Sequence, residues 1–77
     1  MTKREEMSDP ASTWNKVGMD EPVFILRAQD RLARLVILDW IDRARRIGVN
    51  LRKVNGVHEL LGLFEDWRSA HGSKTPD

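Results

Sequence analysis

The stretch that most constrains the fold is residues 30–48, DRLARLVILDWIDRARRIG, because its apolar side chains cover more than one side of a helix. At about 100° per residue, one broad arc forms the expected core face. Its members are Leu32, Ala33, Val36, Ile37, Trp40, Ile41, Ala44 and Ile47. Leu35 and Leu38 point away from this arc, among arginines and Asp42, and form a second apolar strip. The pattern predicts a helix that is sandwiched between neighbours.

The rest of the chain offers few other means of stabilising a fold. A chain of 77 residues forms one domain with a small core. It has no cysteine, and its two histidines lack metal-ligand spacing, so we expect no disulfide, no metal site and no cofactor. We therefore predict a homo-oligomer, at least a dimer. The expected interface residues are Phe24, Leu35, Leu38 and Trp40.

A second helix is expected after a tight connection. Gly48 follows the last periodic residue of the first helix, and Asn50 is a good N-cap for the next, which runs to about Ala70 and ends near Gly72. Its apolar arc is Val54, Val57, Leu60, Leu61, Leu63, Phe64 and Trp67. The Asn55-Gly56 pair is a turn signal inside this pattern, but we expect a continuous helix. Together the two helices predict an αα-hairpin in a mostly α fold.

The flanking segments divide the chain. Residues 1–19 have little apolar periodicity, and we expect a mobile arm. Residues 20–72 form the single helical-hairpin domain, and residues 73–77 form a polar tail. Within this domain, Val23-Phe24-Ile25-Leu26 favours either a short strand that pairs with another chain or an extended segment that lies across the helices. Both alternatives bury Phe24.

Basic residues are concentrated in the middle of the chain, although the net charge is only +1. The densest polar cluster lies where the extended segment meets the first helix, with Asp30 as the expected N-cap. This corner suggests an anion or nucleotide pocket completed at a subunit interface. Its expected ligand-binding residues are Arg27, Gln29, Asp30, Arg31 and Arg34. The alternative is a structural corner in which the arginines pair with nearby carboxylates.

The chain also resembles a known group of proteins. DEPVFILRAQD, then a leucine-rich helix, Gly48-Val49-Asn50, a second helix ending in a tryptophan, and HGSKTPD resemble a family of small uncharacterised bacteriophage and prophage proteins. The resemblance covers about residues 20–77. It implies a phage accessory protein in the cytoplasm of an infected bacterium, and it assigns no activity or site residues.

Enzymatic chemistry has little support in the sequence. No nucleophile-elbow, phosphate-loop or dinucleotide-binding motif is present, and neither histidine has a matched catalytic partner. We expect a non-enzymatic counter-defence protein that sequesters an anionic, nucleotide-type molecule. One alternative is an inhibitor that occludes a host defence protein. Another is a nucleic-acid-binding protein, against which the near-zero net charge argues. No membrane association is expected.

Overall fold

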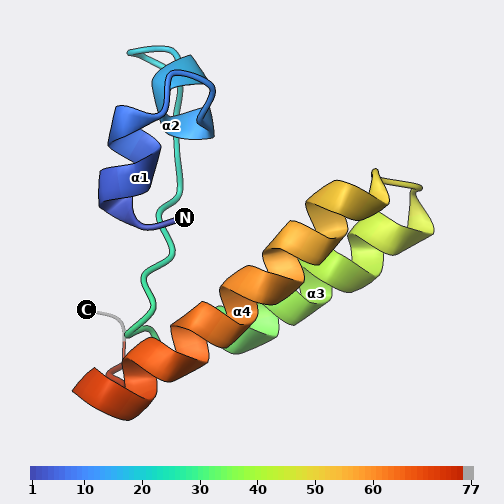
Figure 1. Ribbon diagram of the computed structural model, residues 1–77. Coiled ribbons are helices and arrows are strands. Elements are labelled where there is room, and N and C mark those ends of the chain that lie inside the picture. The colour runs from blue at the N-terminus through green and yellow to red at the C-terminus, as the bar shows by residue number, and fades with distance from the viewer. Residues whose placement is uncertain (76–77) are drawn as a thin grey trace.

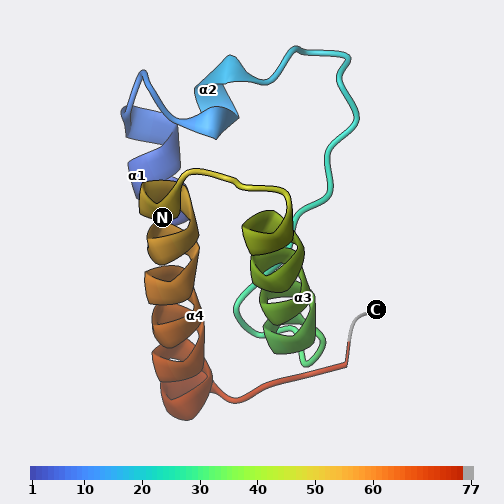
Figure 2. The same ribbon diagram turned by 90° about the vertical axis from the view of Figure 1, so that its right-hand side faces the viewer.

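The computed structural model describes residues 1–75, and this part of the chain is mostly helical. Four helices follow one another: α1 (Lys3–Ser8), α2 (Thr13–Lys16), α3 (Ala33–Arg46) and α4 (Leu51–His71). The two long helices, α3 and α4, lie side by side and run in opposite directions, while α1 and α2 lie at the other end of an extended connection (Figures 1 and 2). The predicted αα-hairpin and mostly α class are therefore confirmed.

The turn between α3 and α4 has the chemistry that the sequence indicated. Gly48 has a φ of 81°, the left-handed conformation that glycine adopts without strain. The Val49 N–H donates to the Ala44 carbonyl at 2.9 Å, and the Gly48 N–H donates to the Arg45 carbonyl at 3.3 Å. These two bonds form a Schellman motif, which satisfies carbonyls at the end of α3. The Asn50 side chain then caps α4 by accepting from the Arg52 N–H at 2.8 Å.

The core lies between the two long helices and is small. Its buried members are Ala33, Ile37, Ile41 and Ala44 of α3 and Val54 of α4. Leu26, Val49, Val57, Leu61 and Phe64 pack around them while remaining half-buried. The buried arc of α3 is thus narrower than the sequence predicted. Four members of the predicted arc stay exposed: Leu32, Val36, Trp40 and Ile47. One neighbouring helix covers only part of such an arc.

The start of α3 differs from the prediction. Asp30 does not cap the helix, which begins at Ala33 with Leu32 at the N-cap. Instead, the Asp30 carboxylate accepts from the Leu32 N–H at 2.7 Å within a preceding turn. Beyond α4, the Lys74 N–H donates to the Gln29 carbonyl at 2.8 Å, and the Arg31 N–H donates to the Lys74 carbonyl at 3.1 Å. We call these two bonds the terminal clasp.

The terminal clasp gives part of the expected polar tail a structural contact. The last two residues of the predicted tail, Pro76 and Asp77, lie outside the described residues. In contrast, α4 meets the expectation closely: it passes through Asn55-Gly56 without a break and ends at His71, with Gly72 at the C-cap. A favourable N-cap and apolar packing outweigh the local turn preference of this dipeptide.

Residues 23–26 form no strand within the described chain. They are extended, and Leu26 packs against the core, as in one of the two alternatives expected. The prediction that Phe24 is buried is wrong for the single chain, where its exposed fraction is 84%. The segment approaches the hairpin only at its end, so Phe24 has no neighbouring helix to cover it.

Residues 1–19 contain two short helices that the sequence pattern did not predict. The Asn15 amide donates to the carbonyls of Glu6, Met7 and Asp9, and the Ser12 hydroxyl donates to that of Glu6. These bonds satisfy the carbonyls at the end of α1 and hold α2 against it. No Cα atom of α1 or α2 comes within 8 Å of one in α3 or α4. We call α1 and α2 the N-terminal unit.

None of the described helices is a candidate for a membrane span. In the part of the chain that the structure describes, every helix is too short or too polar to span a bilayer.

Candidate functional site

The predicted arginine corner combines structural contacts with two unpaired guanidinium groups among the described residues. Asp30 and the backbone of Gln29 are engaged in the turn and the terminal clasp. The Arg34 guanidinium contacts the Glu65 carboxylate of α4 at 2.6 Å, with both side chains about half exposed. Arg27 and Arg31 are exposed, and no ion pair links either to another described residue. Two of the five predicted residues therefore present free charge, and three have other contacts.

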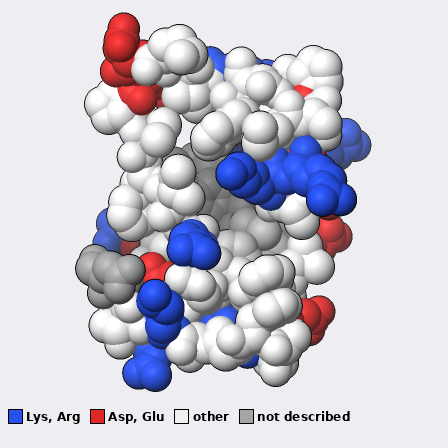
Figure 3. Space-filling model, turned by 90° about the vertical axis from the view of Figure 1, so that its left-hand side faces the viewer, with Lys and Arg blue, Asp and Glu red and all other residues white. Residues whose placement is uncertain are grey.

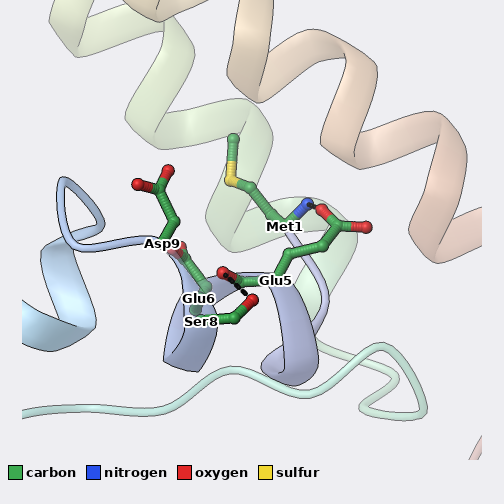
Figure 4. A pocket seen from close by; sticks show the side chains of 5 residues that line it. All are labelled: Met1, Glu5, Glu6, Ser8 and Asp9. Atoms are coloured by element: carbon green, nitrogen blue, oxygen red, sulfur yellow. Dashed lines mark hydrogen bonds and ion pairs between the residues drawn. The ribbon is translucent and has the colours of Figure 1, made fainter.

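Two hollows in the described surface lie away from this corner. One is lined by Met1, Glu5, Glu6, Ser8 and Asp9, at the start of the chain and along α1 (Figure 4). A second, on the same helix, is lined by Lys3, Arg4, Met7 and Ser8. Neither includes a predicted ligand-binding residue. These two hollows are therefore not built from the arginines of the corner.

The first hollow has an acidic lining whose charge is partly compensated. The N-terminal ammonium of Met1 lies 2.6 Å from the Glu5 carboxylate. This hydrogen bond, with the charge attraction and the Thr2 backbone, lowers the pKa of Glu5 below its ordinary value. Among the described residues, no group of three or more His, Asp or Glu side chains is placed to hold a metal ion.

The most unusual exposed feature is the extended segment, residues 22–26. Three bulky apolar side chains, Val23, Phe24 and Ile25, project into solvent in succession. Among the described residues, no backbone hydrogen bond joins residues 22–26 to the rest of the chain. Proline explains one missing donor, whereas the other amides and the carbonyls remain open to solvent. The segment therefore presents both apolar side chains and free backbone groups.

The predicted oligomer-interface residues lie on different parts of the surface. Phe24 is on the extended segment, whereas Leu35, Leu38 and Trp40 are on α3. Leu35 is largely exposed, Leu38 is half-buried, and Trp40 lies on the other flank of the buried row. The structure thus does not join these four side chains into one patch within a chain.

Two of the three arginines in the last turn of α3 are paired with carboxylates. Arg43 pairs with Asp39 at 2.8 Å, and Arg46 pairs with Asp42 at 2.9 Å. On the face shown in Figure 3, Lys and Arg side chains occur in separate groups with acidic side chains among them. A continuous basic surface, which nucleic-acid binding requires, is not visible there.

Some contacts at this end of the molecule were not expected from the sequence. Glu65 was not expected to hold Arg34, and Lys74 was not expected to contact Gln29 and Arg31. Trp67 stacks on His71, with ring centroids 3.8 Å apart. Only this last pair had a local signal, since residues four apart adjoin on a helix.

Comparisons of the chain with family models, with curated proteins and with solved structures found no match.

Proposed function

We propose that this chain is a non-enzymatic binding protein that recognises a protein partner through residues 22–31. The observation that carries the proposal is the succession of exposed Val23, Phe24 and Ile25 on a backbone without internal hydrogen bonds. Fully burying such side chains contributes about 1.5–3 kcal/mol each. A partner that covers these three side chains would therefore gain binding free energy from their burial.

The backbone of this segment favours one mode of recognition. An extended peptide with free N–H and C=O groups can add to the exposed edge of a partner's sheet, and its alternate side chains then enter pockets. Exposed Arg27 and Arg31 follow directly and favour a partner with carboxylates beside that edge. The resemblance to phage-encoded proteins makes a bacterial defence protein the expected partner.

We predict that Phe24→Glu abolishes capture of the partner from a bacterial lysate, because it places a charge where an apolar side chain is buried on binding. Loss of a central aromatic anchor typically weakens binding by about 2 kcal/mol or more, roughly thirtyfold. The measurement is quantitative mass spectrometry of proteins retained by the tagged chain, followed by titration of the purified candidate.

The matched control for this experiment is Leu51→Glu. Leu51 is also an exposed apolar residue, but it lies at the start of α4, away from the segment. The same charge at Leu51 is expected to leave capture unchanged. If both variants retain the same proteins as the unchanged chain, the segment is not the binding site.

A second candidate function is binding of an anionic, nucleotide-type molecule, and the free charges of Arg27 and Arg31 favour it. Under this alternative, a ligand at one hundred times its Kd stabilises the protein by about 2.7 kcal/mol and raises the thermal midpoint. We expect no such rise with linear or cyclic nucleotides, because Arg34 is already paired with Glu65, and Gln29 and Asp30 are engaged in the terminal clasp and the turn. A rise that disappears in Arg31→Glu would establish the nucleotide alternative instead.

A further inference from the structure

The two sides of the helical hairpin differ in character. Arg34 contacts Glu65, and the Arg45 guanidinium lies 3.0 Å from the His58 ring nitrogen, so these residues mark the polar side. At about 100° per residue, Val36 and Trp40 lie on the opposite flank of the buried row of α3. On α4, the opposite flank from His58 and Glu65 bears other apolar residues. They are Leu60, Phe64 and Trp67.

Because the helices are antiparallel and adjoin along their buried rows, these flanks lie on the same side of the hairpin. We call this surface the apolar face; it comprises Val36, Trp40, Leu60, Phe64 and Trp67. The exposed fractions of Val36, Trp40 and Trp67 are 46%, 40% and 48%, while Leu60 and Phe64 are half-buried.

The N-terminal unit leaves most of this surface open. The Met1 side chain reaches α4 beside Gly56, about one turn before Leu60. No Cα of the N-terminal unit, however, comes within 8 Å of either long helix. Within the described part of the chain, the apolar face therefore has no helix packed on it.

The surface area of the chain indicates how much remains to be covered. The accessible surface is 6508 Å². A compact monomer of the same mass exposes about 4,800 Å², so this chain exposes about 1,700 Å² in excess. A standard protein interface removes about 800 Å² from each partner. Part of this excess comes from the extended segment and the N-terminal unit, and the exposed sides of the hairpin, which include the apolar face, contribute the rest.

From these observations we infer that the apolar face binds a second copy of this chain, so that two hairpins form a four-helix bundle. Packing of hairpins through such faces is a standard way to complete a small helical core. A second copy fits better than an unrelated protein for two reasons. The net charge of +1 causes little repulsion between copies. The rim arginine Arg43 is already paired with Asp39, and Lys53, two turns before Leu60 on the same flank of α4, can keep its ammonium group in solvent at the end of the face.

This inference does not depend on the proposed partner-binding segment, which lies outside the apolar face. It also relocates the interface expected from the sequence. Of the residues predicted for that role, Trp40 lies on the apolar face, whereas Leu35 lies on another side of α3. The two surfaces can therefore be tested separately.

The experiment is sedimentation velocity of the full chain at about 10 μM, a concentration above the Kd of an interface of this size. We expect twice the mass of 8.9 kDa for the unchanged chain. Val36→Glu with Trp67→Glu places charges on both helices of the apolar face and is expected to weaken dimerisation at least about 100-fold. The matched control, Leu35→Glu with Leu51→Glu, alters exposed apolar residues elsewhere on the same two helices and should remain dimeric.

A second measurement avoids the possibility that the variant fails to fold. For an unaltered dimer, the thermal midpoint rises with protein concentration, because association stabilises the folded state. A monomeric mass at about 10 μM, or a midpoint independent of concentration over about a hundredfold range, would overturn the inference. If only the control variant, Leu35→Glu with Leu51→Glu, dissociates the dimer, the inference is also overturned, and the interface includes Leu35 or Leu51 instead.

Discussion

Val54→Asp is expected to unfold the helical hairpin. Val54 is the largest fully buried side chain, with an exposed fraction of 0%, and it lies in the cluster formed with Ile37, Ile41 and Ala44. An aspartate in this apolar cluster must be buried either charged or protonated. The cost is about 4–5 kcal/mol or more. The core of a chain of this length rarely supplies more than about 3–5 kcal/mol of net stability, so the loss removes most or all of it.

Circular dichroism and urea denaturation measure this loss directly. The matched control is Val23→Asp, the same substitution at a valine whose exposed fraction is 59%. A surface change of this kind is expected to alter the free energy of unfolding by no more than about 0.5 kcal/mol. A helical Val54→Asp protein with an unchanged midpoint would show that the core is not where the structure has it.

Gly48→Ala and Gly62→Ala are expected to change stability in opposite directions. Gly48 has a φ of 81°, and an alanine forced into this conformation loses about 1–2 kcal/mol. Gly62 lies within α4, and an added Cβ there would meet no atom within 4 Å. Alanine at that position is expected to stabilise the helix by about 0.5–1 kcal/mol, because glycine loses more backbone entropy on folding.

The two alanine variants serve as each other's control, since they make the same chemical change. Urea denaturation should give midpoints on opposite sides of that of the unchanged chain. Equal shifts in one direction would contradict the left-handed turn and, with it, the connection between α3 and α4.

The hairpin was predictable because its signals are local. Periodic apolar residues define both long helices, and the bounds of α4 follow from Asn50 and Gly72. The exposure of Val36 and Trp40 was not predictable, since periodicity shows that a side is apolar but not how many neighbours cover it. The N-terminal unit was missed for another reason: polar bonds from Asn15 hold it, and these leave no apolar pattern.

The candidate site was predictable only in part. Sequence proximity brought Gln29, Asp30 and Arg31 to one corner, as expected. The pairing of Arg34 with Glu65 depends on the register between α3 and α4, which periodicity does not determine. The free backbone of residues 22–26 is likewise a property of the folded chain, because the same residues favour a strand wherever a neighbour is present.

The terminal clasp has a consequence for the order in which this molecule forms. Contacts near Gly48 join residues close in sequence, and zipping from this turn is rapid. The contact between Asp30 and Lys74, by contrast, closes a loop of 44 residues, which carries a larger entropic cost. A chain still emerging from the ribosome lacks Lys74 until both long helices have been synthesised. The direction in which residues 22–26 leave the hairpin is therefore fixed only after α4 and Lys74 are in place.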